Sequence, residues 1–323
     1  MSSSGSPTQP HPFRGRIGPD ASSGYYPAPH RYQLYLSLSC PGCLGIAITY
    51  DLLRLHDRVE LTLLPAVPDD AGGYEVLRPA YEATAHRCAG PAAVPALVDR
   101  WTGRVVSNHA PHILRDLANR FRADGPELFP AGLDGAIERV VRCCDQRIGE
   151  AAQRAGQASP RARQSPNGQS PNGQYAPNGQ QGRPAPGAPE AEDHESGGRA
   201  SALESLLAGL DAMEEALADG GPFVLGTELT AADVHLWTTL VQLDTIHRWH
   251  LDAEAVHRIA ARRHVWGYAR RLLRQPAFRG RLRTDDIASR HHHHCRGQEA
   301  AGAAVQIIDW ATPDLPAPVR RPH

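Results

Sequence analysis

The side chains with the clearest potential for chemistry are Cys40 and Cys43, which flank Pro41 and Gly42. Proline is favoured at the first position of a helix, and the residues that follow have helical apolar spacing. Unpaired N–H groups and the helix dipole stabilise negative charge at the start of a helix. A thiolate at Cys40 would therefore be a better nucleophile and a better leaving group than an ordinary buried thiol.

The second cysteine lies one helical turn after the first, so Cys43 can reach Cys40 to form an intramolecular disulfide. Such a pair could resolve a mixed disulfide without a second small thiol. The alternative is that both are small core residues. An alternating apolar strand, Cys-Pro-x-Cys and a helix together predict a thioredoxin-like redox or transferase domain.

An α/β pattern surrounds the cysteine pair. The expected elements are strands at 32–38 and 59–65, a helix at 41–56, an irregular crossover at 68–92, a hairpin from 94–99 and 104–107, and a helix at 111–121. This order is thioredoxin-like. It puts Val94-Pro95 where that fold has a cis-proline loop that faces the active cysteine.

The rest of the chain has helical patterns. The expected helices are at 134–153, at 202–218, from 229–230 onward, and at 253–275. Thr230 and Asp233 have the spacing of a capping box. Residues 158–198 have few aliphatic side chains and repeat Pro-Asn-Gly-Gln, which predicts a disordered insertion between two helices.

These patterns predict a fold of two domains, an α/β thioredoxin-like N-terminal domain and an all-α C-terminal domain. The expected boundaries are an irregular tail at 1–30, the thioredoxin-like domain at 31–122, the helical domain with its insertion at 123–295, and a C-terminal extension at 296–323.

The composition indicates which kinds of partner and which cellular compartment to expect. With a net charge of −1, the protein has no overall positive field that would attract nucleic acid or an anionic membrane. No apolar run is long enough to span a membrane. The polar N-terminus lacks an apolar signal core, and six irregularly spaced cysteines do not form a disulfide framework. We therefore expect a cytoplasmic protein in a reducing compartment.

Several further motifs occur in one register along the chain. They are Phe13-Arg14, Arg31-Tyr32-Gln-Leu-Tyr35, Cys40-Pro41, Val94-Pro95-Ala-Leu97-Val-Asp99, Val105-Val106-Ser107-Asn108, Leu229-Thr230 with Asp233, Leu236, Thr239-Leu240 and Asp244, and Thr284 to Ile287 through Ile307-Ile308. In this register, residues 12 to about 310 resemble glutathione S-transferases of the Xi class, the glutathionyl-hydroquinone reductases. The insertion is outside the resemblance.

The resemblance implies a glutathione S-transferase architecture, a homodimer and a two-step reaction. The active cysteine attacks the sulfur of a glutathionyl-hydroquinone and expels the hydroquinone, and a second glutathione resolves the mixed disulfide. The nucleophile falls on Cys40. We assign thiol binding to Val94, Pro95, Ser107, Asn108 and His109, and substrate binding to Tyr35, His247 and His291.

This chain departs from the family at its thiol and phenol contacts. A tryptophan is replaced by Gly42, and a Glu-Ser pair that holds the γ-glutamyl end of glutathione is replaced by His109-Ala110. The two tyrosines with which the family contacts the phenolic oxygen correspond to positions near Gly149 and His291 of this chain. The thiol is therefore glutathione or another low-molecular-weight thiol such as mycothiol, and the second substrate is a hydrophobic electrophile.

Two other interpretations stay open. The lost contacts fit a non-catalytic binding or scaffold protein with a transferase fold. The run from His291 to His294 invites a metal-binding interpretation, but adjacent histidines diverge and zinc needs four placed ligands, so we expect no metal. We expect the vicinal pair Cys143 and Cys144 to have one core and one exposed face.

Overall fold

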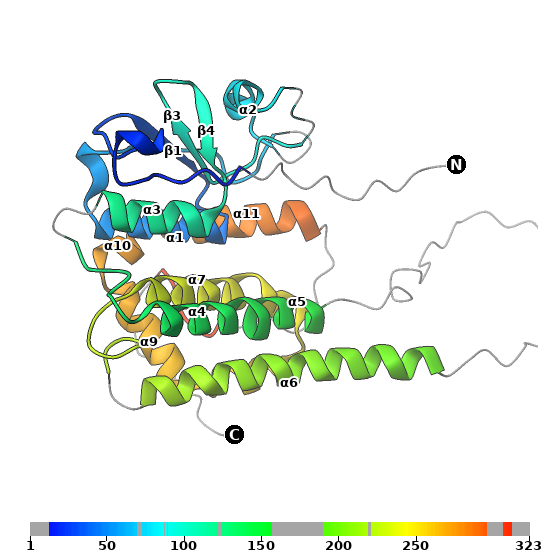
Figure 1. Cartoon of the computed structure of the whole chain (residues 1–323). Helices are drawn as coiled ribbons and strands as arrows, with labels where there is room; N and C mark the ends of the chain where they lie inside the picture. Colours follow the sequence, from blue (N-terminus) through cyan, green and yellow to red (C-terminus); the bar gives the residue numbers. More distant parts are fainter. Residues whose placement is uncertain are drawn as a thin grey trace, which may run out of the picture.

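The computed structural model describes residues 13–69, 73–86, 88, 90–121, 125–156, 190–218, 221–295 and 306–311. Figure 1 shows a small sheet with its helices above a layer of longer helices. The mixed α/β domain followed by a helical domain is the fold class that the sequence predicts. No helix within the described ranges is long and apolar enough to cross a membrane.

The sheet has four strands in the order β2-β1-β3-β4. The strands are β1 (Tyr32–Leu36), β2 (Glu60–Leu63), β3 (Ala96–Asp99) and β4 (Arg104–Ser107). β1 is parallel to β2 and antiparallel to β3, and β3 pairs with β4 in the expected hairpin. The Val94–Pro95 peptide bond is cis, as the fold predicts.

Helices cover both faces of the sheet. Helix α1 (Pro41–Leu52) and helix α3 (Ala110–Arg120) pack on one face, and α2 (Arg78–Thr84) packs on the other (Figure 1). Side chains of a strand alternate between the two faces. Leu34 and Leu36 of β1 therefore join the larger hydrophobic cluster with α1, whereas Tyr35 packs against the smaller cluster on the α2 side.

The second domain is helical in its described part. Its elements are α4 (Asp134–Arg142), a π-helical segment (Cys143–Gly149), α5 (Glu150–Gly156), α6 (Glu190–Ala218), α7 (Ala231–Thr245), a 3-10 turn (His247–His250), α8 (Ala253–Ala260), α9 (Arg263–Leu273), α10 (Pro276–Arg279) and α11 (Thr284–Cys295). Three expectations need correction here. The helix predicted at 134–153 contains the π-helical segment, and the one at 253–275 is two helices with a break at Arg262, whose ψ is 88°.

The third correction concerns the insertion. We predicted disorder over 158–198, but α6 begins at Glu190, so the last part of that range is helical; Glu190, Ala191 and Glu192 favour helix, although Gly197 and Gly198 do not. Residues 157–189 lie outside the described residues, as does most of the predicted C-terminal extension. Within that extension, the backbone N–H groups of Ile307 and Ile308 donate to the buried Asp244 carboxylate at 2.9 and 3.0 Å.

Residues 13–30, predicted as an irregular tail, are built into the first domain. Phe13 and Ile17 are buried, and residues 21–23 form a 3-10 turn. The Ile17 N–H donates to the Asp116 carboxylate of α3 at 2.9 Å. Burial of two apolar side chains and these hydrogen bonds outweigh the weak local propensity of a segment rich in Ser, Pro and Gly.

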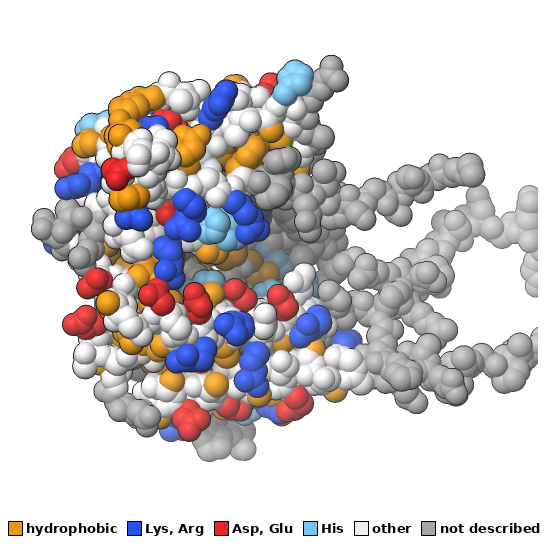
Figure 2. Space-filling view, viewed as in Figure 1, with side chains coloured by type: hydrophobic (Ala, Val, Ile, Leu, Met, Phe, Trp, Pro, Cys, Tyr) orange, Lys and Arg blue, Asp and Glu red, His pale blue; other side chains and the backbone are white. Residues whose placement is uncertain are grey.

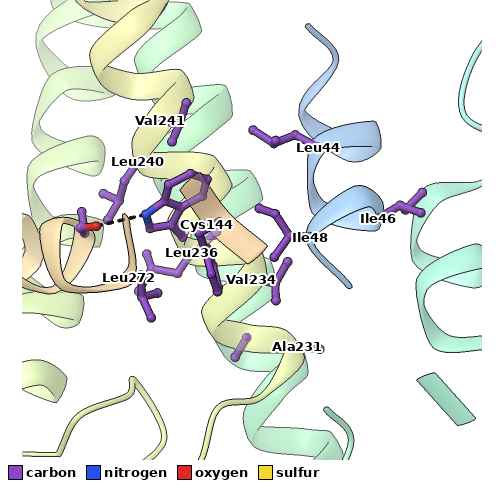
Figure 3. Packing of buried hydrophobic residues seen from close by; sticks show 14 of the residues in the cluster. Leu44, Ile46, Ile48, Cys144, Ala231, Val234, Leu236, Leu240, Val241 and Leu272 are labelled. Carbon is purple, nitrogen blue, oxygen red and sulfur yellow. Dashed lines mark hydrogen bonds between the residues drawn. The ribbon is translucent and has the colours of Figure 1, made fainter. Parts of the chain in front are cut away.

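The two domains share one apolar core along α1 and α7. In Figure 3, Leu44 and Ile48 of α1 point toward Val234 and Val241 of α7, whereas Ile46 points to the opposite side of α1. α1 and α7 lie close at Gly45, where a Cβ would be in ordinary van der Waals contact with a Val234 methyl at 3.7 Å. This packing fixes the start of α1 against the helical domain.

Candidate active site

Cys40 lies at the N-cap of α1, in an extended conformation with φ −96° and ψ 128°. Pro41 follows at the first helical position, as predicted. The thiol is half-buried, and a hydrogen bond from the Cys43 thiol lowers the pKa of Cys40. The backbone N–H groups of Cys43 and Gly42 and the charge of Arg290 act in the same direction. Burial opposes them, and the pKa is held at about 6.

Cys43 is completely buried. Burial raises its pKa well above the ordinary value, and the hydrogen bond and charge of Cys40 add to this. The pair is therefore asymmetric: Cys40 is the thiolate, and Cys43 keeps its proton as a donor. The structure brings the two predicted cysteines together and gives them different roles.

A small polar network supports the turn before Cys40. Ser37 and Ser39 are buried, their hydroxyl oxygens lie 2.9 Å apart, and they donate to the carbonyls of Pro65 and Ala66 at 2.8 and 2.7 Å. These bonds connect the turn to the loop after β2, so the position of Cys40 is fixed by hydrogen bonds as well as by α1.

A cavity of about 810 Å³ opens between the two domains, beside Pro41 and Gly42. Gly42 and Gly45 of α1 leave room for it. Its apolar wall comes from Leu114, Phe129, Ile137, Val141, Ile148, Val234 and Leu243. Gly149, one position assigned to a lost tyrosine, also lines it. A hydrophobic ligand of moderate size fits such a lining.

The rims of the cavity carry opposite charges. Figure 2 shows a hollow between the domains, with basic and histidine side chains above it and acidic side chains below it. Arg16, His109, His112 and Arg115 line the thioredoxin-like side, and Glu138, Asp145 and Glu150 line the helical side. Several are already paired: Arg16 with Asp116, Arg115 with Asp134, and Asp145 with His235.

His109 is the N-cap of α3, and its ring meets the His112 ring edge-on at a centroid distance of 4.3 Å. Burial lowers the pKa of His109, and the charges of His112, Arg14 and Arg16 lower it further. The Nδ1 atoms of both rings are buried and have no hydrogen-bond partner in the described part of the chain. An ammonium group would meet basic side chains here, where the family has a carboxylate.

Two of the predicted thiol-binding residues need correction. The Asn108 side chain accepts from the Phe13 N–H at 2.9 Å and donates to the Tyr81 hydroxyl at 3.1 Å. The Ser107 hydroxyl donates to the Phe13 carbonyl at 3.3 Å. Because both side chains hold the N-terminal segment, neither lines the cavity. Val94 packs between the two hydrophobic clusters, next to the cis Pro95.

The three predicted substrate-binding residues have different outcomes. His247 lines the cavity, and burial, followed by the charges of His250 and His291, lowers its pKa to about 4. Tyr35 is a correction, because strand alternation turns it to the α2 side of the sheet, away from the cavity. His291 is buried against His250, with ring centroids 5.0 Å apart, and does not line the cavity.

The sequence interpretation missed Arg290, whose charge acts on both cysteines. No local pattern singles out one arginine in α11. Of the vicinal pair, Cys144 is buried and lines the cavity, whereas Cys143 is half-buried. No cluster of three His, Cys, Asp or Glu side chains in the described ranges has the arrangement of a metal site.

Comparisons with known proteins agree with this geometry. The family model for the glutathione S-transferase C-terminal domain matches residues 174–271. The chain is similar to members of the glutathione S-transferase superfamily, both in this helical domain and in its fold. A Xi-class transferase from Natrialba magadii has the same fold, with a TM-score of 0.69, 20% identity and coverage of 96% of this chain and 91% of that chain.

Two curated relatives are glutathionyl-hydroquinone reductases. YqjG from Escherichia coli (strain K12) is 23% identical over 94% of this chain and 86% of its own length. Its glutathione-bound structure has a TM-score of 0.67 at 21% identity and covers 88% of this chain and 89% of that chain. PcpF from Sphingobium chlorophenolicum is 25% identical over 77% of this chain and 72% of its own length.

Proposed function

We propose that this protein is a thiol-dependent reductase that removes a low-molecular-weight thiol from an aromatic or quinone-derived adduct. The observation that carries the proposal is a Cys40 thiolate at the start of α1, directly before Pro41 and Gly42, which line an apolar cavity of about 810 Å³. Hydrogen bonds and the charge of Arg290 outweigh burial and hold the pKa of Cys40 at about 6, so the thiolate is present at neutral pH. The relatives YqjG and PcpF are named for a reaction of this class.

The reaction has two steps. The Cys40 thiolate attacks the thioether sulfur, a sulfur–sulfur bond forms, and the carbon–sulfur bond breaks. The electron pair goes to the aromatic carbon, which takes a proton. A second thiolate then attacks the small-thiol sulfur of the mixed disulfide, and the Cys40 thiolate leaves.

Cys43 offers another route for the second step: its thiolate attacks the Cys40 sulfur, the Cys40–Cys43 disulfide forms, the small thiolate leaves, and two further small thiols then reduce the disulfide. Its thiol donates a hydrogen bond to Cys40, so it lies within reach of the mixed disulfide. It must lose its proton to attack, and burial disfavours that loss. Once Cys40 is bonded to the small thiol, its negative charge is gone, which removes one of the contributions that raise the pKa of Cys43.

The thiol itself is proposed to be one without a γ-glutamyl ammonium, such as mycothiol. The start of α3 presents His109 and Ala110 in place of a carboxylate and a hydroxyl, with Arg14 and Arg16 acting on the same ring. Glutathione, which the solved YqjG structure holds, is the competing thiol. A homodimer in the cytoplasm stays a prediction from the sequence.

The test uses Cys43→Ser with Cys40→Ser as its matched control. Each protein is mixed with a mycothiol or glutathione conjugate of a hydroquinone, and the masses of the intact protein and the released phenol are measured. We expect Cys43→Ser to release phenol once and to carry one thiol on Cys40, and Cys40→Ser to do neither. If the wild type releases no phenol from either conjugate, the protein is instead a non-catalytic binding protein with this fold.

A further inference from the structure

Helix α11 belongs to the second part of the chain but lies beside the first domain. Figure 1 shows it in the upper layer, and it also contacts α7 of the layer below. Ile287, in its first turn, is completely buried. Ile287 belongs to the large hydrophobic cluster that also contains Leu44 and Ile48 of α1, so α11 and the helix that follows Cys40 share one core.

Two arginines connect this segment to opposite ends of α1. Arg281, just before α11, donates from Nε and Nη2 to the Asp51 carboxylate at 2.6 and 2.5 Å, in the last turn of α1. Arg290, on α11, donates from Nη1 to the Ser39 hydroxyl at 3.5 Å, and Ser39 directly precedes Cys40, the N-cap of α1. The twelve residues of α1 span roughly 18 Å, so the two contacts hold α11 along the length of that helix.

The Arg290 contact is part of the polar network around Cys40. The Ser39 hydroxyl donates to the Ala66 carbonyl, so its lone pairs are free to accept from the guanidinium. The Arg290 side chain also hydrogen-bonds to Tyr74, on the far side of the same loop. A guanidinium is always charged at neutral pH, and these contacts fix its direction.

We propose that Arg290 is a positioning residue that keeps Cys40 in its thiolate form, with the Arg281–Asp51 ion pair setting the register of α11 on α1. This rests on the proposed function. In the second step the bond between Cys40 and the small-thiol sulfur breaks, the electron pair returns to Cys40, and a new disulfide leaves. A cation beside Cys40 favours that leaving group, just as it favours the nucleophile in the first step.

The helix terminus alone does not account for the site. The backbone N–H groups at the start of α1 come with the fold, whereas Arg290 comes from α11, hundreds of residues further along the chain. The proposal therefore makes thiolate formation depend on α11 being seated. Removal of the charge should change the pH dependence of Cys40 without changing the sheet.

The experiment measures the rate at which iodoacetamide alkylates Cys40 across pH 4 to 9, followed by mass spectrometry of the Cys40 peptide. The variants are Arg290→Gln, Arg290→Lys and, as matched control, Arg279→Gln on α10, an exposed arginine. We expect Arg290→Gln to move the midpoint of the curve of alkylation rate against pH upward by roughly one pH unit. Arg290→Lys should restore at least half of that shift, and Arg279→Gln should leave the midpoint unchanged.

An unchanged midpoint in folded Arg290→Gln, or an equal shift in Arg279→Gln, would overturn the proposal. Circular dichroism checks folding, and Arg290→Met, which also removes the charge, supplies the comparison if Arg290→Gln does not fold. A raised midpoint in folded Arg290→Met supports the role, and a midpoint identical to wild type counts against it. A wild-type midpoint near 8.5 would instead contradict the proposed function, because that is the value of an unactivated thiol.

Discussion

At the scale of single residues, Cys40 and His109 have pKa values that are set by their immediate neighbours. At Cys40, a hydrogen bond from a buried neighbour outweighs the cost of burial, and the pKa is about 6. At the start of α3, His109 replaces a carboxylate with a ring that burial and nearby arginines keep neutral. Under the proposed function, Cys40 is the nucleophile, and the start of α3 has lost the group that would hold an ammonium.

This difference predicts the thiol preference of a double variant. His109→Glu with Ala110→Ser places a carboxylate and a hydroxyl at the start of α3, next to the cavity. A hydrogen bond from an ammonium group to that carboxylate should raise glutathione affinity by roughly tenfold. Isothermal titration of each protein with glutathione measures the change.

The matched control is His257→Glu, which puts the same charge on the exposed surface of α8. We expect no change in its glutathione affinity. Equal affinity in the double variant and the wild type would mean that the start of α3 does not contact the thiol.

At the scale of elements, α7 depends on a buried capping box. Thr230 is its N-cap, and the Asp233 carboxylate accepts from the Thr230 N–H and the Val224 N–H, both at 2.8 Å. The Tyr268 hydroxyl of α9 also donates to Asp233 at 2.9 Å. One carboxylate therefore ties together the start of α7, the loop before it and α9.

Asp233→Ala should accordingly lower the free energy of unfolding by about 3 kcal/mol, because it leaves several buried donors without an acceptor. Asp252→Ala is the matched control. Asp252 caps the exposed start of α8 through one bond to the Ala255 N–H at 2.8 Å, so its loss should cost about 1 kcal/mol. Urea unfolding measures both, and equal losses would show that burial of the box adds nothing.

At the scale of the whole molecule, α11 and the helical domain meet at a group of histidines. His247 lines the cavity, His250 is in the same 3-10 turn, and the His291 ring of α11 lies against His250. Protonation of His247 would put a charge in a poorly solvated place, near two other rings. The contact between the segments is therefore sensitive to acid.

The pKa of His247 is lowered to about 4, from an ordinary value of 6.5. Between these values the unfolded chain binds the proton and the folded chain does not. The contribution of neutral His247 to the free energy of unfolding is therefore fully present above pH 6.5. It is lost as pH falls toward 4, by on the order of 2 kcal/mol after allowance for solvent at the cavity.

Chemical unfolding of the wild type at pH 7 and pH 4.5 should reveal this loss, and His247→Gln should reduce it. His257→Gln, at an exposed position of α8, is the control and should leave the pH dependence as in wild type. The same loss in His247→Gln and wild type would mean that other groups cause the acid sensitivity.

Local signals account for what the sequence by itself determined. The strand before Cys40, the proline at the start of α1, the hairpin and the Thr230–Asp233 box all depend on neighbours within a few residues, and all are present. Their geometry follows from backbone sterics, capping and side-chain periodicity. These signals were enough for the two-domain fold and for the position of Cys40 at the start of α1.

Tertiary packing alone decided which side chains surround the cavity. Ser107 and Asn108 bind Phe13, and Tyr35 faces α2, although their types and positions in sequence suited a ligand. Arg290 meets Ser39 across 251 positions of the chain. Such partners are set by how α11, the N-terminal segment and α1 bury their apolar faces against one another, which no local pattern records.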